Sequence, residues 1–440
     1  MNRRLAMVLG VGAAVALIGA AWAASDPSHD ADDLISHILK QDNSSVPAPK
    51  PGAPAQPPSG AEPIIMSTRI GEHEDRTRFV VEMSDPVQIR VFTLSSPDRV
   101  VIDMPAVQWH LDGPPRPTGN GAVRSYRYGL FRSGNSRFVI DLNKPMKVSD
   151  PLVLPPSDGY GYRVVIDLFP VSPDQFARSS GWPADLKARE AAAEQLAVAP
   201  PVPVAPAPEK RIIVIDAGHG GIDTGTSGVN GLQEKDLVLD EALRLGRELV
   251  KRSNYTVHLT RDTDVFIPLK ERVAIARSWH ADLFISLHAD SNPDPNVNGL
   301  SIYTLSERGS DKEAAALASK ENQSDVIAGV DLGGGNATVA PILIDLAQRD
   351  TMNRSSRFAT GAVTMLTSAT DILPRQPHRA AAFVVLKAPD VPAVLIELGY
   401  LSNEGDAGQM NTVRWRNGVA KAVAQAVDGY FAPAVGTANP

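Results

Sequence analysis

The 440-residue sequence contains no cysteine. Thiol catalysis, disulfide bonds, iron–sulfur clusters and cysteine-ligated zinc sites are therefore excluded. Positive charge is also in short supply, because the formal net charge is −7 at pH 7. Without an overall basic field the chain has no general means of holding nucleic acid, so no nucleic-acid partner is expected. Any bound metal must be held by histidine and carboxylate side chains.

An apolar run near the N-terminus is a candidate export signal. The run, Leu5–Ala24, follows Arg3 and Arg4 and ends on the small-residue pattern Ala21-Trp22-Ala23. This combination is typical of a cleaved signal peptide, so we predict a signal over residues 1–24, a periplasmic mature protein and no stable membrane span after cleavage. The arginine pair permits either the general secretory or the twin-arginine route. The alternative is an uncleaved anchor, since about 20 residues can span a bilayer.

Proline-rich stretches divide the rest of the chain. Val46–Pro58 and Ala199–Pro208 have too few large apolar groups to fold, and we predict that they are extended linkers. The length and a hydrophobic content of 43% suit more than one packed domain. The predicted parts are a proline-rich disordered segment (25–61), a β domain (62–170), a Pro/Ala-rich linker (171–210), a catalytic domain (211–433) and a tail (434–440).

The predicted β domain contains an internal repeat. Arg78–Met83 (RFVVEM) matches Arg137–Leu142 (RFVIDL), and Arg99–Met104 (RVVIDM) matches Arg163–Leu168 (RVVIDL). Short β-branched runs of this kind, separated by Pro, Ser, Asp and Gly, are typical of antiparallel strands. The repeat therefore predicts a small all-β sandwich of two sheets with pseudo-twofold symmetry.

The C-terminal half alternates between strand and helix patterns. Ile212–Ile215 is a continuous apolar run, typical of a strand covered on both faces, and Leu237–Val250 then carries apolar residues at helical spacing. The alternation predicts an α/β catalytic domain with a mostly parallel sheet flanked by helices. It is interrupted by an insertion over about 306–388. Further strands are expected over Tyr255–Thr260, Leu283–Leu287, Leu300–Thr304 and Val394–Leu398, and helices over Leu269–Arg277 and Val413–Tyr430.

Polar residues stand where these strands end. His219 follows the first strand within a glycine-rich turn, His288 ends the strand over Leu283–Leu287, and Glu397 ends the strand that begins at Val394. Glu234 lies at the start of the first helix. Ligands of open parallel sheets bind beyond the carboxyl ends of the strands, so these side chains could converge on one crevice.

Two imidazoles and one carboxylate form a hydrolytic zinc site when the fourth position is left to water. A further carboxylate, for which Glu397 is best placed, would then accept the proton of the water. Simpler interpretations remain: a histidine at a strand end is often structural, and Glu234 suits a first helical turn. The glycine-rich turn also suggests a phosphate-binding loop, but it lacks the Gly-Lys-Ser/Thr ending of a P-loop.

At these residues the sequence resembles the zinc-dependent N-acetylmuramoyl-L-alanine amidases (amidase_3 family) of the AmiC type. The resemblance implies that His219, Glu234 and His288 bind Zn²⁺ and that Glu397 is the catalytic glutamate. It also implies that residues 62–170 form an AMIN domain, which binds peptidoglycan. The motifs that carry the resemblance are Ile213–Gly221 (IVIDAGHGG), Gly231–Asp236 (GLQEKD), Thr260–Asp264 (TRDTD), Ser286–Asp290 (SLHAD) and Pro392–Asn403 (PAVLIELGYLSN).

The resemblance extends to the insertion. Residues 314–330 are similar to an inhibitory helix that blocks the zinc site of such amidases until an activator protein with a LytM-like domain displaces it. Glu321 would then be the inhibitory zinc ligand; the alternative is a solvent-facing helix with an exposed glutamate. Possible substrate contacts are Arg261, Asn292, His378 and Arg379.

The sequence thus predicts an exported peptidoglycan hydrolase. It would cleave the amide between N-acetylmuramic acid and the L-Ala of the stem peptide during wall remodelling and daughter-cell separation. Two alternatives are kept: a zinc peptidase that acts within the stem peptide, and a wall-binding protein without catalytic activity.

Overall fold

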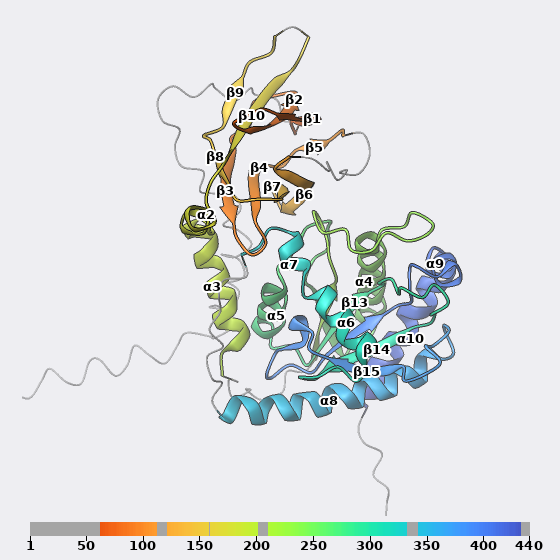
Figure 1. The fold of residues 1–440 in the computed structure, drawn as a ribbon. Coiled ribbons are helices and arrows are strands. Elements are labelled where there is room, and N and C mark those ends of the chain that lie inside the picture. The colour runs from red at the N-terminus through yellow and green to blue at the C-terminus, as the bar shows by residue number, and fades with distance from the viewer. Residues whose placement is uncertain (1–61, 112–120, 158, 201–209, 332–341, 433–440) are drawn as a thin grey trace, which may run out of the picture. The chain divides into compact units, whose positions relative to one another are not determined.

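The strands of the N-terminal half form two sheets, as the repeat predicts (Figure 1), and all their strand pairs are antiparallel except the short parallel pair of β1 with β5. The computed structural model describes residues 62–111, 121–157, 159–200, 210–331 and 342–432, so the predicted signal and the proline-rich stretches over 25–61 and 201–209 lie outside the described residues. One sheet has the order β5-β1-β2-β10-β8, with β9 beside β10, and the other has the order β3-β4-β7-β6. The bounds are β1 (Ile64–Glu72), β2 (Thr77–Met83), β3 (Arg90–Leu94), β4 (Arg99–Pro105), β5 (Gln108–Trp109), β6 (Val123–Arg132), β7 (Asn135–Leu142), β8 (Met146–Val148), β9 (Leu152–Leu154) and β10 (Tyr162–Pro170).

The two halves of the repeat exchange strands. In one sheet β2 pairs with β10, and in the other β4 pairs with β7, so each sheet contains one motif-bearing strand from each half of the repeat. The ion pairs follow the same symmetry: Arg78 binds Asp167 across the first sheet, and Arg137 binds Asp103 across the second. Alternate residues of all four strands fill one core between the sheets, with Phe79 and Phe138 packed edge to face. The symmetry of the repeat is therefore present in the fold.

The segment after the β domain contains two helices, α2 (Pro173–Ser179) and α3 (Ala184–Val198), within the range predicted as a linker. Ser172 and Gln175 form a reciprocal capping box that begins α2. Arg189 of α3 binds Glu271 of the following domain, so this segment is held against the α/β domain. The described residues between 62 and 432 belong to one compact unit that includes both domains.

The C-terminal half is an α/β domain with a sheet of the order β12-β11-β13-β16-β14-β15. Strands β12, β11, β13 and β16 are parallel, β14 is antiparallel to β16, and β15 is parallel to β14, so the predicted mostly parallel sheet is confirmed. The strands are β11 (Arg211–Ala217), β12 (Tyr255–Leu259), β13 (Leu283–His288), β14 (Ser301–Leu305), β15 (His378–Ala381) and β16 (Ala393–Glu397). The helices are α4 (Glu234–Val250), α5 (Leu269–Ser278), α6 (Lys312–Glu321), α7 (Ser324–Ile327), α8 (Ile342–Leu366), α9 (Glu404–Met410) and α10 (Val413–Phe431), with a 3₁₀ turn, η2, at Val384–Leu386.

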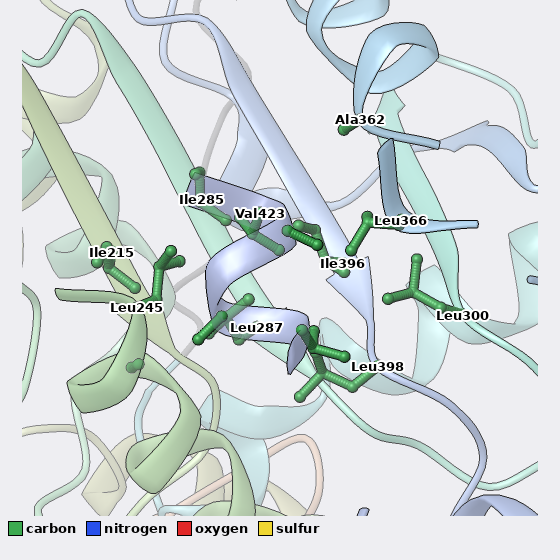
Figure 2. Close-up of a cluster of buried hydrophobic side chains, with 14 of the residues drawn as sticks. Ile215, Leu245, Ile285, Leu287, Leu300, Ala362, Leu366, Ile396, Leu398 and Val423 are labelled. Atoms are coloured by element: carbon green, nitrogen blue, oxygen red, sulfur yellow. The ribbon is translucent and has the colours of Figure 1, made fainter. Parts of the chain in front are cut away.

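Apolar side chains cover both faces of this sheet, which explains its continuous apolar strands. Figure 2 shows one face, where Ile215, Ile285 and Ile396 of three strands meet Leu245 of α4 and Val423 of α10. Alternate strand residues pack on the opposite face against α5, α6 and η2. Among the described residues, no helix combines the length and the apolar character needed to cross a membrane.

One buried acid on α4 has no role in the candidate site. Glu241 is 1% exposed, and its carboxyl oxygens have no hydrogen-bond partner among the described residues. Burial, with a smaller contribution from Asp240, raises the pKa of Glu241 to about 8. In the unfolded chain the Glu241 carboxyl group ionises near pH 4.5, whereas in the folded protein it stays protonated until about pH 8. The free energy of unfolding therefore falls as the pH rises between these two values.

We expect Glu241→Gln to remove that loss. The variant should gain roughly 2–4 kcal/mol in free energy of unfolding at pH 8 relative to the original protein, and much less at pH 5. Urea unfolding at both pH values measures the difference. Glu248→Gln, which changes a more exposed acid of the same helix, is the matched control. Equal pH dependence in both variants would show that Glu241 does not ionise on unfolding.

Candidate metal centre and active site

Three strand ends and one helix start bring the predicted residues together. His219 follows β11, His288 ends β13, and Glu397 ends β16. The parallel register sets His288 directly beside Glu397. Glu234 is the first residue of α4, and the loop that precedes α4 returns it to the same edge of the sheet. The strand ends and the loop before α4 therefore bring all four side chains to one edge of the sheet, as predicted.

The turn after β11 adopts an unusual backbone. His219 has a φ of 56°, which is uncommon for a residue with a side chain, and Gly220 and Gly221 have φ values of 121° and 55°. A Cβ atom at Gly221 would lie 1.8 Å from the carbonyl oxygen of Leu130, so only glycine fits there. The turn aims the His219 ring at the edge of the sheet and brings the backbone against β6.

Four donor atoms surround one point. Nε2 of His219 lies 3.1 Å from Oε1 of Glu234 and 3.4 Å from Oε2 of Glu321. Nδ1 of His288 lies 3.2 Å from the same Glu234 oxygen and 3.1 Å from the same Glu321 oxygen. Ligands about 2.1 Å from a tetrahedral zinc ion are separated by about 3.4 Å, so these spacings fit such an ion. His219, His288 and Glu321 also stand out as a buried group able to hold a metal.

The charges at this point favour a cation. Burial opposes protonation of both imidazoles, but carboxylates outweigh it: Glu234, Asp223 and Glu321 raise the pKa of His219 well above its usual range. Glu321 and Glu234 likewise raise the pKa of His288 to about 10. Burial works against the charge of Glu234, yet the two imidazoles lower its pKa well below the usual range. The negative charge of these buried carboxylates stabilises positive charge on the neighbouring imidazoles. The same charge would stabilise a metal ion bound between them.

Hydrogen bonds from surrounding groups hold His219 and Glu234 in position. Oδ2 of Asp223 lies 2.9 Å from Nδ1 of His219, which fixes the ring and leaves Nε2 without a hydrogen-bond partner. The backbone amides of Thr226 and Ala289 donate to the Glu234 carboxylate at 2.9 and 2.8 Å. Asp223 is absent from the sequence prediction. Its signal was a carboxylate four residues after His219, in a loop that shows no periodic pattern.

Glu397 lies beside this cluster with one oxygen free. Its side chain is fully buried; Oε2 accepts the backbone N–H of Asp290 at 3.0 Å, and Oε1 has no hydrogen-bond partner among the described residues. Burial raises the pKa of Glu397 well above its usual range; His288 opposes the shift, and the Asp290, Glu234 and Glu321 carboxylates add to it. A buried carboxyl group with a raised pKa is suited to exchange protons near neutral pH.

Helices α6 and α7 fill the space over the cluster. Lys320 binds the buried carboxylate of Asp290, Glu321 reaches both imidazoles, and Ser324 donates to Asp223. The cavity that remains has a volume of about 10 Å³, close to the smallest that admits one water molecule. With α6 and α7 in this position, the cavity that the described residues leave is too small for a substrate of sugar or peptide size.

The predicted helix over 314–330 is interrupted. Helix α6 ends at Glu321, α7 spans Ser324–Ile327, and Gly329 has a φ of 70°. The side chain of Asn322 explains the break, because it donates to the carbonyl oxygen of Ala382 and accepts the amide of Val384. A single continuous helix over 314–330 is therefore wrong, although its first part is helical as expected.

The four possible substrate contacts lie in different surroundings. Arg261 is buried and donates to backbone carbonyl oxygens, including those of Ala217 and Gly218, so it supports the turn beneath His219. Asn292 lies in the loop after β13, where its side chain accepts the amide of Asp294. His378 and Arg379 lie on β15. Arg379 lines an open hollow of about 690 Å³ together with Asp311, Lys312, Glu313, Arg375 and Gln376.

Comparisons with known proteins identify the family of the chain. Residues 213–429 match the family model of N-acetylmuramoyl-L-alanine amidases, and residues 67–153 match the AMIN domain. The chain is 32% identical over 386 residues to N-acetylmuramoyl-L-alanine amidase AmiC of Escherichia coli. The matched region covers 84% of this chain and 89% of that protein.

Two further relatives extend the comparison. AmiC of Neisseria meningitidis is 31% identical over 404 residues, covering 90% of this chain and 96% of the relative. AmiA of Escherichia coli is 38% identical over 223 residues, covering 50% of this chain and 76% of the relative. Because the two AmiC relatives exceed 30% identity along most of this chain and of their own length, and because residues 67–153 match the AMIN domain, the chain belongs to the family of N-acetylmuramoyl-L-alanine amidases that carry an AMIN domain.

Proposed function

We propose that the protein hydrolyses the amide between N-acetylmuramic acid and the L-Ala of the peptidoglycan stem peptide, with Zn²⁺ held by His219, Glu234 and His288. The observation that carries this proposal is the convergence of four buried donor atoms at spacings of 3.1–3.4 Å beside the free oxygen of Glu397. The amidase relatives supply the substrate class.

The chain's own residues divide the work of hydrolysis. Zinc, when bound, lowers the pKa of a water molecule and polarises a carbonyl group. Glu397 accepts a proton from the attacking water while the oxygen of that water bonds to the lactyl carbonyl carbon. Glu397 then gives the proton to the nitrogen of L-Ala as the C–N bond breaks. Asp223 keeps the His219 ring in the orientation that leaves Nε2 free to coordinate.

Digestion of purified sacculi tests the reaction. The expected products are intact stem peptides that begin with L-Ala, together with glycan strands that carry no peptide. Fragments cut inside the stem peptide would instead support a zinc peptidase. Binding without any release of peptide, in a protein freed from α6 and α7 and loaded with zinc, would support a wall-binding protein without activity.

We infer that α6 and α7 inhibit the site and that Glu321 occupies the position the substrate needs. An activator protein, with a LytM-like domain as the family resemblance implies, would displace them. The AMIN domain binds peptidoglycan and so directs the enzyme to the wall. An N-terminal signal over 1–24 would carry the protein to the periplasm, where it would act in wall remodelling and daughter-cell separation.

Glu321→Ala tests the inhibition. Removing this carboxylate takes away a ligand of the closed site, so the basal rate of sacculus hydrolysis without activator should rise about tenfold or more. Glu307→Ala, which removes an exposed acid from the loop before α6, is the matched control and should leave the basal rate unchanged. If both variants retain the basal rate of the original protein, Glu321 does not inhibit the site.

A further inference from the structure

The chain that leaves α7 lies against the second sheet of the β domain. Residues 326–330, called the docking segment below, present backbone carbonyl oxygens to three arginines of that sheet. Arg99 donates to Val326 at 2.8 Å, and Arg137 donates to Ala328 and Gly329 at 3.1 and 3.2 Å. Arg127 donates to Val326 at 3.2 Å and also to Ile327. Carbonyl groups at the end of a helix have few internal partners, and here arginines bind them; the carbonyl oxygen of Val326 also accepts the amide of Gly329.

Apolar contacts also join the docking segment to the second sheet. Ala328 and Val330 are fully buried in a cluster with Val101 and Val139 of the β domain. A Cβ atom at Gly329 would lie 2.8 Å from a methyl carbon of Val139 and 3.2 Å from one of Val101. The docking segment therefore fits the sheet closely, and position 329 accepts only glycine without a shift.

The pseudo-twofold repeat provides an internal comparison. Arg127 pairs with Asp141 just as its repeat equivalent Arg69 pairs with Glu82. The side chain of Arg69 is 47% exposed, whereas that of Arg127 is 22% exposed. Likewise Arg78 is 37% exposed, while its equivalent Arg137 is completely buried. Both sheets carry the same arginine–acid ladder, but the docking segment covers only the second.

The docking segment is connected directly to the candidate metal centre. Ser324 of α7 donates to Asp223, the partner of His219, and Asp325 accepts the amide that begins α5. Only four residues separate Glu321 from the docking segment. Movement of Glu321 away from the imidazoles therefore requires α7 to move as well, and α7 is fixed at its far end by the β domain.

We propose that the second sheet of the β domain is the docking surface for residues 326–330, and that this contact holds Glu321 in the metal centre. The inference rests on the proposed inhibition by Glu321. It makes the AMIN domain a part of the inhibitory device: release of the docking segment from Arg99, Arg127 and Arg137 and withdrawal of Glu321 are one coupled event.

Two variants of the full chain weaken the contact from opposite sides. Gly329→Ala adds a methyl group to the docking segment and leaves the β domain unchanged. Arg127→Ala removes donors from the β domain and leaves the docking segment unchanged. The matched controls are Gly361→Ala, at a helical glycine with open space around it, and Arg69→Ala, the repeat equivalent of Arg127.

Hydrogen–deuterium exchange of the amides of 324–330 is the direct measurement, and hydrolysis of a soluble muramoyl peptide without activator is the second. Exchange should accelerate about tenfold in Gly329→Ala and Arg127→Ala, because each loses charge-assisted hydrogen bonds or the close fit. Basal hydrolysis should rise several-fold in the same two variants. Neither quantity should change in the controls.

The outcomes separate this inference from the proposed function. If Glu321→Ala activates the enzyme but both docking variants keep the original exchange and basal rate, the docking role is overturned and inhibition by Glu321 stands. If exchange accelerates while Glu321→Ala and the docking variants all keep the basal rate, docking is real, but it does not control the site. Unchanged exchange in both docking variants overturns the inference whatever the activity.

Discussion

Replacement of Glu397 by glutamine is expected to reduce kcat/KM for hydrolysis by about a thousandfold, with zinc content unchanged. The amide is nearly the same size as the carboxylate and still accepts the N–H of Asp290, so the fold at the end of β16 is retained. What it loses is the capacity to take a proton from water and pass it to the leaving amine, a function that contributes roughly 10²–10⁴-fold in enzymes.

The comparison is best made in the Glu321→Ala background, so that the closed site does not mask the effect. Glu404→Gln is the matched control, because Glu404 is exposed and lies shortly after the same strand. Metal content measured by atomic emission distinguishes loss of proton transfer from loss of zinc. Activity within a few-fold of the parent would show that another group transfers the proton.

The main features of the site could be predicted because strand ends are visible in a sequence. Continuous apolar runs locate parallel strands, and the polar residue that follows each run must lie at the same edge of the sheet. His219, His288 and Glu397 were found in this way. Glu234 followed from its place at the start of the first helix. The structure brings all four together, with the ligand roles themselves still proposals.

Residues that act through nonlocal contacts could not be predicted. Asp223 lies in a loop without periodicity, and its role depends on how the backbone turns after His219. Arg137 carries no sign in the sequence that it meets the carbonyl of Ala328, 191 residues further along the chain. The break after α6 likewise depends on a contact with the distant residue Ala382. Each feature is fixed by tertiary packing, whereas periodicity reports only local structure.

In the β domain, too, the repeat allowed some features to be predicted and left others unpredicted. Equivalent motifs predicted two sheets and pseudo-twofold symmetry, and both are present. The exchange of strands between the halves was not predicted, because the sequence of a strand does not indicate which other strand it pairs with. Nor could the sequence distinguish Arg127 from Arg69, whose ion pairs match, although in the structure Arg127 also binds the docking segment and is less exposed.

Loss of a metal ligand is expected to have the largest effect of all. Glu234→Gln should abolish measurable hydrolysis and lower the bound zinc to a small fraction of one equivalent. One oxygen of Glu234 faces both imidazoles at 3.1 and 3.2 Å, and backbone amides hold its carboxylate in place. A neutral amide at this position leaves two imidazoles without the charge that compensates a divalent ion. Glu248→Gln on the same helix is the control.

The pH dependence of metal binding follows from the same charges. Carboxylates raise the pKa of His219 well above its usual range and that of His288 to about 10, so zinc must displace protons from both rings. Apparent zinc affinity should therefore fall steeply as the pH is lowered from 8 to 6, and binding should release protons that calorimetry in buffers of different ionisation enthalpy can count. Chelation should remove activity, and added zinc should restore it. Hydrolysis that persists after the metal has been removed would mean that the four donor atoms serve a purpose other than catalysis.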